Sequence, residues 1–379
     1  LRARAGNFDN QGIRKAVTYA HAHGVKIYIT VNIFAHNRDL DALEEYLLFL
    51  QDADADALIV ADPGILYFCQ HIVPTLPVHL STQANVANSA AVRFWSDQVV
   101  TRLNLARELG IEEIRTIRQA TTAKLEVFVH GALCISYSGR CMLSNYFTGR
   151  NSNQGDCAHP CRYSYSLVEE KRPGLYFPVE EDERGTYIFN ARDLCLLKRL
   201  PELVAAGVNA VKIEGRMKST GYVASTVRVY RAALNYINEQ QNAGLPLAEI
   251  MLPDYFHNEI NKVGTRGQTE NFFNESPSSD AMLYDTMRKN QPYAPVAVVR
   301  QQNPLLVEAR NIMKIGDQIE YLGHKLMPEV CTIVLMTTVD GICQERANPG
   351  NRIIITIDPV PDNLQVNAIF RKRLKQKNK

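Results

Sequence analysis

The chain has 379 residues, of which 46% are hydrophobic and 22% are charged. This ordinary globular composition excludes intrinsic disorder, and the length allows two domains or one large barrel with an appendage. The formal net charge of +2 gives no strong overall field that would attract nucleic acid. No apolar run reaches the roughly 20 residues that cross a bilayer, and no secretory segment is present, so we expect a soluble, cytoplasmic protein.

The first two thirds of the chain alternate short apolar runs with amphipathic stretches. The runs that predict strands are Val25–Asn32, Ala57–Ala61, Pro77–Ser81, Val99–Ala106, Leu125–Val129 and Ala210–Glu214. The stretches with a helical period are Leu40–Leu50, Ala87–Trp95, Ile111–Ile117, Leu194–Ala206 and Tyr222–Gln240. Repeated β–α units with hydrophobic strands predict a parallel sheet with helices outside it.

The fold class that fits this alternation is α/β, a TIM-type (β/α)8 barrel of which residues 1–250 supply six strands. Because the chain begins at Leu1 inside what reads as a strand-to-helix connection, we expect an N-terminal truncation that removes the other two strands. A doubly wound open sheet is the alternative, but no glycine-rich phosphate loop follows any strand. The segment at about 131–190 interrupts the alternation as an insertion, and 251–291 reads as a linker or wrapping segment.

The last part of the chain has a different sequence pattern. Short runs rich in β-branched residues alternate with turn formers: Val296–Val299, Leu305–Ala309, Gln318–Tyr321, Cys331–Met336 and Arg352–Ile357. This pattern predicts a small all-β barrel over residues 292–371, followed by a basic tail at 372–379. From Arg371 to Lys379 the chain has six basic residues and no acidic one. Such an end either contacts phosphates or is frayed and solvated.

Polar side chains that are capable of chemistry follow several of the predicted strands. They are Asn32, Asp62, Thr82, Gln83, Arg107, Glu108, His130, Glu214 and Arg216. Barrel enzymes carry their chemistry at this end of the strands, so the recurrence predicts an active site there. Each of these residues, taken singly, is also explained as a cap or turn residue.

Four of the eight cysteines are clustered. They follow the pattern C-x6-C-x15-C-x3-C from Cys134 to Cys161, with Cys141 and Cys157 between. Four thiolates brought together need a soft metal to offset their repulsion, and both an iron–sulfur cluster and tetrahedral zinc provide one. The pattern lacks the tight C-x2-C pairs of zinc ribbons, which favours iron–sulfur, while zinc and unliganded thiols remain alternatives.

The cysteine cluster lies in a segment with a recognisable sequence. The run Glu126–Arg162, EVFVHGALCISYSGRCMLSNYFTGRNSNQGDCAHPCR, resembles the hallmark segment of the peptidase U32 family. More narrowly, it is similar to the branch of prephenate-dependent tRNA uridine hydroxylases. Other blocks agree, namely HLSTQAN at His79–Asn85, EEDERGTYIFNARDL at Glu180–Leu194, KIEGRMKS at Lys212–Ser219 and ARNIMKIGDQIEYLG at Ala309–Gly323. The resemblance covers essentially the whole chain.

The resemblance implies oxygen-independent hydroxylation at C5 of the wobble uridine in a tRNA anticodon loop. It also implies prephenate as oxygen donor and a 4Fe–4S cluster as cofactor. The ligands of that cluster would be Cys134, Cys141, Cys157 and Cys161, with Cys195 as an alternative to Cys161. Asn151 and Val99 depart from the residues usual in the family, which bears on substrate preference rather than on the reaction class.

The same polar residues supply the remaining candidates. The catalytic candidates are His130, Arg107, Glu108, Glu214 and Arg216, and the substrate-binding candidates are Gln83, Asn85, Arg140, Lys212 and Lys218. The cations suit the carboxylates of a small anionic co-substrate and the phosphates of RNA. His130 is either a proton shuttle or a hydrogen-bonded neighbour of the cluster. Gln83 and Asn85 either bind a uracil edge or cap a strand. For Lys212 and Glu214 a salt bridge inside the barrel is the alternative.

Three other functions stay open on the sequence alone. A peptidase of the U32 (collagenase-like) type needs an activated nucleophile or a metal-bound water, but the chain has neither H-E-x-x-H nor G-x-S-x-G. Cys134 and His130, four residues apart at a strand end, are awkwardly placed as a thiol–imidazole pair. Hydroxylation of rRNA or of a ubiquinone precursor is the second alternative, and a non-catalytic iron–sulfur subunit is the third.

Overall fold

A computed structural model of the chain describes residues 7–134, 136–154, 156–162, 192–216, 218–264, 267–274 and 292–374. It also describes two short hairpins, which pair Leu167–Val168 (β6) with Tyr176–Phe177 (β7) and Glu181–Asp182 (β8) with Gly185–Thr186 (β9). The chain divides into two compact units. The first comprises Leu1–Leu196, Glu202–Glu214 and Thr269–Thr286, and the second comprises Leu197–Pro201, Gly215–Gln268 and Met287–Lys379.

The first unit is built on a mostly parallel sheet of eight strands. In chain order they are β1 (Tyr28–Val31), β2 (Ala57–Val60), β3 (Val78–Leu80), β4 (Arg102–Asn104), β5 (Lys124–Gly131), β10 (Asp193–Cys195), β11 (Ala210–Ile213) and β12 (Gln268–Thr269). Strands β1 to β5 are neighbours in sequence order and pair in parallel, and β11 also pairs in parallel with β5. Strand β5 is buried from its second residue to its last, as expected for a strand covered on both faces.

All six strands predicted from the sequence are present, and two were not predicted. Strand β10 follows the part of the chain that carries Cys134 to Cys161, called the cysteine segment below. It pairs antiparallel with β5, with Cys195 opposite His130. The prediction of a helix over Leu194–Ala206 is therefore wrong at its start, since α8 (Leu200–Ala205) begins only after this strand and a 3₁₀ turn. The apolar run at 194–197 fits a buried strand and a buried helix equally well, because periodicity cannot separate them over so few residues.

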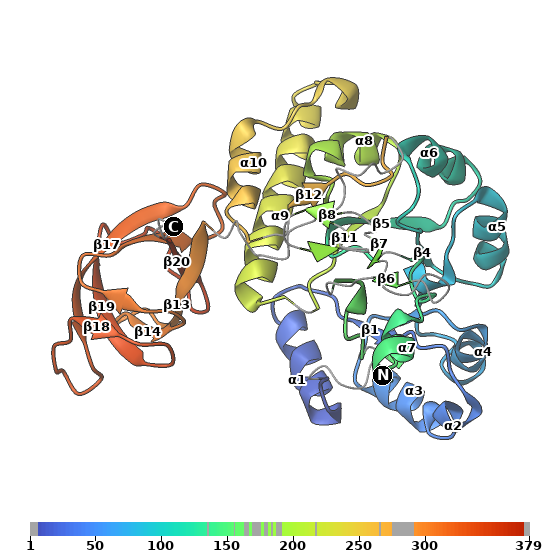
Figure 1. Cartoon of the computed structure of the whole chain (residues 1–379), viewed down its shortest axis with the longest axis horizontal. Helices are drawn as coiled ribbons and strands as arrows, with labels where there is room; N and C mark the ends of the chain where they lie inside the picture. Colours follow the sequence, from blue (N-terminus) through green and yellow to red (C-terminus); the bar gives the residue numbers. More distant parts are fainter. Residues whose placement is uncertain are drawn as a thin grey trace. The chain divides into compact units, whose positions relative to one another are not determined.

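Helices lie around the strands of the first unit (Figure 1). They are α1 (Asn10–His21), α2 (Asn37–Leu40), α3 (Leu43–Asp52), α4 (Pro63–Ile72), α5 (Ser89–Asp97), α6 (Ile111–Gln119) and α7 (Leu143–Thr148). Local sequence sets where several of them begin. Asp62, a strand-end candidate, is the N-cap of α4 and accepts a hydrogen bond from the Ile65 backbone at 3.0 Å, with Pro63 at the first position of the helix. For Asp62 the cap interpretation is therefore correct.

The second unit joins two helices to a closed antiparallel barrel. The helices are α9 (Thr220–Asn242) and α10 (Asp254–Asn261), and the barrel strands are β13 (Tyr293–Gln301), β14 (Leu306–Ala309), β16 (Gln318–Leu322), β17 (Glu329–Thr337), β19 (Arg352–Asp358) and β20 (Ile369–Arg373). A separate ribbon pairs β15 (Met313–Lys314) with β18 (Arg346–Ala347). In no described part of the chain is a helix both long and apolar enough to cross a membrane.

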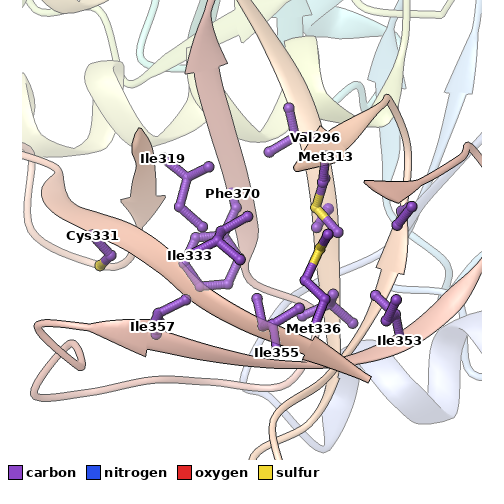
Figure 2. Close-up of a cluster of buried hydrophobic side chains, with 14 of the residues drawn as sticks. Val296, Met313, Ile319, Cys331, Ile333, Met336, Ile353, Ile355, Ile357 and Phe370 are labelled. Atoms are coloured by element: carbon purple, nitrogen blue, oxygen red, sulfur yellow. The ribbon is translucent and has the colours of Figure 1, made fainter. Parts of the chain in front are cut away.

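The barrel core forms because alternate side chains of each strand point inward. Ile353, Ile355 and Ile357 of β19 are buried while their neighbours are less so, which is the two-residue period of a strand with one covered face. Figure 2 shows these isoleucines gathered with Val296, Met313, Ile319, Cys331, Ile333, Met336 and Phe370. The small all-β barrel predicted from the sequence is confirmed.

The start of the predicted basic tail is part of this barrel. Residues 371–373 belong to β20, which closes the barrel by pairing with β13 and β16. Arg371 is only 3% exposed, and Lys372 donates to Asp317 at 2.8 Å. Residues 371–373 are therefore not a frayed, solvated end, because acidic side chains pair with Arg371 and Lys372. Residues 375–379 lie outside the described part of the chain.

Arg371 belongs to a buried charge network inside the second unit. Glu259 of α10 accepts from Arg371 at 2.7 Å, from Arg228 of α9 at 2.8 Å and from Lys262 at 2.7 Å. Glu320 of β16 accepts from Arg371 at 2.6 Å and faces Lys262 at 3.3 Å. Two carboxylates thus hold three cations and tie both helices to the barrel.

Candidate active site at the carboxyl ends of the strands

The parallel strands of the first unit end at one edge of the sheet and place several candidates there. Gln83 lies in the turn after β3, Arg107 follows β4, His130 ends β5 with Gly131, and Glu214 follows β11. The close approach of two of these ends requires glycine at position 131. A Cβ on Gly131 would lie 2.3 Å from the carbonyl oxygen of Glu214, and its φ of +111° is itself one that favours glycine.

Arg107 is the central cation at this edge. Its guanidinium donates to the Ala132 carbonyl at 3.1 Å, lies 3.7 Å from a carboxylate oxygen of Glu214, and stacks 3.9 Å from the centre of the Phe128 ring. Burial lowers the pKa of Arg107, while the charges of Glu214 and Cys134 act to raise it. The side chain is therefore held in one place beside the first cysteine.

A second set of charges lies beneath this edge, centred on Glu126 of β5. Its carboxylate accepts from Arg102 at 3.1 Å and from Asn104 at 3.0 Å, and lies 3.2 Å from Nζ of Lys212. The ammonium of Lys212 also lies 5.3 Å from the centre of the Phe128 ring. Lys212 and Glu214 thus each form a salt bridge, but Lys212 pairs with Glu126 and Glu214 pairs with Arg107. Glu126 and Asn104 were not among the residues predicted from the sequence, although each is a polar residue inside an otherwise apolar run, which is a usable signal.

His79 of β3 is a buried titratable group in this interior. Burial, reinforced by the charge of Arg102, lowers the pKa of His79 to about 4. Its ring packs edge-on against Tyr28 at 4.6 Å between centroids. His79 is therefore neutral near pH 7 and is not a proton donor there.

This shift predicts a pH dependence of stability. Between the unfolded pKa of 6.5 and the folded value of about 4, the unfolded chain binds a proton at His79 that the folded chain does not. The free energy of unfolding should therefore fall as the pH drops through this window, by about 3 kcal/mol in total. Urea unfolding at several pH values measures the slope. A His79→Phe variant cannot take up the proton, so its total loss of unfolding free energy over this pH window should be smaller than that of wild type by the same amount. An unchanged pH dependence would contradict the assignment.

The cysteine segment is docked onto the loop after β1. The side-chain amide of Asn153 accepts from the Phe34 backbone N–H at 2.9 Å and donates to the Phe34 carbonyl at 3.1 Å. The Arg140 guanidinium lies 5.1 Å from the centre of the Phe34 ring. A Cβ on Gly139 would lie 3.1 Å from that ring and 3.2 Å from the amide nitrogen of Gln83. The turn at 138–140 is thus packed against both the β1 and β3 ends.

Cys134, Cys141 and Cys157 lie within electrostatic reach of one another. Burial raises the pKa of Cys134, the charges of Cys141 and Cys157 raise it further, and Arg107 acts to lower it. The surrounding loop is ordered by short bonds. Ser152 donates to the Cys141 carbonyl at 2.9 Å, and the His159 backbone N–H donates to the Cys157 sulfur at 3.4 Å. Cys161 is half-buried in the 3₁₀ turn Pro160–Arg162.

The donors are thiols, the ligand type that both an iron–sulfur cluster and a zinc ion take. Among the described residues, no group of three or more His, Cys, Asp or Glu side chains could hold one metal ion. A zinc ion would draw every sulfur to about 2.3 Å from one point. A cubane cluster instead binds sulfurs at separate corners. Thiols whose charges interact, but which do not surround a single point, would be compatible with such a cluster.

The remaining candidates fall into three groups. Gln83 is 2% exposed. The side-chain amide of Asn85 donates a hydrogen bond to the Gln83 backbone carbonyl at 2.9 Å. Glu108 is half-buried, and burial raises its pKa. Arg216 and Lys218 belong to the second unit, where the Lys218 ammonium lies 4.8 Å from the centre of the Tyr222 ring. Two aromatic residues that follow the last cysteine of the pattern, Tyr163 and Tyr165, lie outside the described residues.

Comparison with known proteins gives a consistent set of relatives. The sequence model of peptidase family U32 matches residues 1–283. The tRNA hydroxylation protein P1 of Bacillus subtilis (strain 168) is 36% identical over 346 residues, which cover 90% of this chain and 80% of that protein. The tRNA hydroxylation protein P of Escherichia coli (strain K12) is 33% identical over 417 residues, covering 98% and 89%. A 23S rRNA 5-hydroxycytidine synthase of E. coli is 36% identical over 262 residues, covering 69% of this chain and 39% of that protein.

Proposed function

Because the chain belongs to peptidase family U32, and its tRNA hydroxylation relatives match it over most of its length, we propose that it is a tRNA hydroxylase. The finer proposal is C5 hydroxylation of the wobble uridine without molecular oxygen, with prephenate as oxygen donor. The single observation that carries it is the grouping of Cys134, Cys141 and Cys157 with Arg107 at the carboxyl edge of the sheet. We also propose that this sheet follows the plan of a (β/α)8 barrel, which places chemistry at that edge.

The reaction explains why a redox centre is needed at this place. Replacing C5–H by C5–OH removes two electrons from the pyrimidine, and prephenate, as the proposed oxygen donor, would take up those two electrons as it gives up its oxygen; the site must therefore hold both reactants and a way to pass electrons. A 4Fe–4S cluster, held by Cys134, Cys141, Cys157 and Cys161, supplies one-electron chemistry when it is bound. Arg107 then has two tasks. Its charge offsets the thiolates, and its contacts to Ala132 and Glu214 fix it in the position where an anionic co-substrate would meet it.

The cysteine segment also carries the features that suit single-stranded RNA. Three of its aromatic side chains are well exposed, namely Tyr137 at 50%, Tyr146 at 84% and Phe147 at 54%. Exposed aromatic rings serve as stacking platforms for unpaired bases, which is how proteins commonly read RNA loops. Arg140 in the same segment is exposed and adds a cation for a phosphate. We propose that the anticodon loop binds here, with its base directed towards the edge of the sheet.

The test combines nucleoside analysis with metal analysis. Deleting the gene from its host should remove 5-hydroxyuridine derivatives from total tRNA, and returning the chain should restore them. Protein purified without oxygen should contain iron and sulfide. Unchanged tRNA together with peptide cleavage would instead support the peptidase alternative. A colourless protein that contains only zinc after anaerobic purification would overturn the iron–sulfur proposal.

A further inference from the structure

The side chain of Gln83 is the clearest anomaly in the first unit. It is 2% exposed, yet within the described part of the chain neither Oε1 nor Nε2 has a hydrogen-bond partner. Burying a polar group without a partner costs about 1–3 kcal/mol, so such groups are rare and need an explanation. Because both ends of the amide lack a protein partner among the described residues, a bound group that offers one donor and one acceptor would satisfy both.

The backbone around Gln83 is firmly held, so the unpaired amide does not come from a loose loop. The Ser81 backbone N–H donates to the Val60 carbonyl at 2.7 Å, and the Thr82 hydroxyl donates to the Leu105 carbonyl at 3.0 Å. Asn85 then reverses the chain with a φ of +54°, a conformation that asparagine tolerates. The turn is thus tied to β2 and to the end of β4.

A capping role does not account for the Gln83 side chain. The cap of this 3₁₀ turn (Thr82–Ala84) is Ser81, whose hydroxyl accepts from the Gln83 backbone N–H at 3.4 Å. Asn85 supplies the other local bond by donating to the Gln83 carbonyl. The local bond thus accounts for the amide nitrogen of Asn85, whose Oδ1 is also buried without a partner among the described residues, whereas neither polar atom of the Gln83 side chain is accounted for.

What lies next to the amide is the cysteine segment. A Cβ at Gly139 would lie 3.2 Å from both Cγ and Nε2 of Gln83, so only a glycine lets the segment pass this closely without displacing the amide. Gly139 has a φ of +79°, which also favours glycine. The unpaired amide thus lies beside the loop that carries the proposed cluster ligands and the exposed aromatic rings.

We propose that Gln83 is the residue that recognises the target base, by pairing its amide with the edge of a pyrimidine ring. A uracil edge places the N3–H donor beside a carbonyl acceptor, and these match Oε1 and Nε2 of one carboxamide. A carboxylate or phosphate offers acceptors only and would leave Oε1 unpaired, so the ligand is a neutral ring edge rather than the anionic co-substrate. This inference rests on the proposed function for the identity of the RNA, but it assigns a distinct residue and a distinct contact.

The test uses Gln83→Met, which keeps the volume and removes both polar atoms. Without RNA, the variant should melt about 2–5 °C higher than wild type, because an uncompensated buried amide is removed. With RNA, wild type should bind an anticodon stem-loop with uridine at the target position about tenfold or more better than the same RNA with an abasic site there, since two hydrogen bonds are lost. The variant should lose this preference.

Gln70→Met is the matched control. The Gln70 amide donates to the Gln98 carbonyl at 2.7 Å, so this variant should melt lower than wild type and keep the full preference for uridine. The inference is overturned if Gln83→Met also melts lower, or if it retains the wild-type preference. If wild-type protein binds neither RNA, the proposed function fails together with this inference. If wild type prefers uridine and the variant does too, only the inference about Gln83 fails.

Discussion

A Cys134→Ser variant is expected to lose tRNA hydroxylation by at least about 100-fold and to lose most of its iron. Replacing a residue that only orients a metal ligand commonly costs 10–100-fold, so a direct ligand should cost more. The charges of Arg107, Cys141 and Cys157 all act on Cys134, so the change removes a thiol that interacts with the central cation and with two other cysteines of the pattern. Iron and sulfide content of anaerobically purified protein, and 5-hydroxyuridine in tRNA of a complemented deletion strain, give the two readouts.

The control for this prediction is Cys343→Ser. Cys343 is also an exposed, free cysteine, but it lies in the barrel of the second unit, outside the four-cysteine pattern. The Cys343→Ser variant should keep wild-type iron content and activity. Comparing Cys161→Ser with Cys195→Ser then identifies the fourth ligand, which we expect to be Cys161, since Cys195 is buried in β10. Full activity in Cys134→Ser would contradict the cysteine assignment.

The fold was largely predictable from the sequence because its parts have local signatures. The six parallel strands fall on runs of five to eight residues rich in apolar side chains, and the barrel strands alternate in a two-residue period. Strand β10 escaped prediction because its three residues adjoin an apolar helical stretch, so nothing local marks the boundary. Its antiparallel pairing with β5 depends on the path of the cysteine segment rather than on its own sequence.

The candidate site was predictable in its residues but not in its contacts. Arg107 and Glu214 were both recognisable as polar residues at strand ends, yet nothing in the sequence pairs them with each other. The clamp of Asn153 on Phe34 joins residues 119 positions apart and leaves no periodic signal. The same limit explains Gln83, since a missing hydrogen-bond partner is a property of packing and not of sequence.

Long-range charge pairing is what the sequence could not predict. Glu259 lies in the stretch predicted as a linker or wrapping segment, and Arg371 lies where the predicted barrel meets the predicted basic tail; polar residues surround both. In the folded chain each neutralises the other at 2.7 Å with almost no exposure, at 2% for Glu259 and 3% for Arg371. A polar composition predicts that a segment is exposed to solvent only where no oppositely charged residue from a distant part of the chain pairs with it and buries it.

Replacing Glu259 with leucine should destabilise the second unit by about 3–5 kcal/mol. Removing one partner of a buried ion pair leaves uncompensated charge, here the guanidiniums of Arg228 and Arg371. Burial acts to raise the pKa of Glu259, but the hydrogen bond from Lys262 and the charge of Arg371 outweigh it and lower that pKa. The carboxylate is therefore charged at neutral pH and holds both helices to the barrel. Calorimetry at pH 7 measures the loss as a lower melting temperature.

Asp362→Ala is the matched control in the same unit. Asp362 and Lys325 form an exposed pair at 4.0 Å, with side-chain exposures of 81% and 65%, so its removal should cost no more than about 1 kcal/mol. Adding Arg228→Met and Arg371→Met to Glu259→Leu should restore part of the lost stability, because apolar side chains then replace the stranded guanidiniums. If Glu259→Leu costs as little as Asp362→Ala, the network is only an arrangement of charges that water could solvate equally well, and the barrel and its helices must be held together by apolar packing alone.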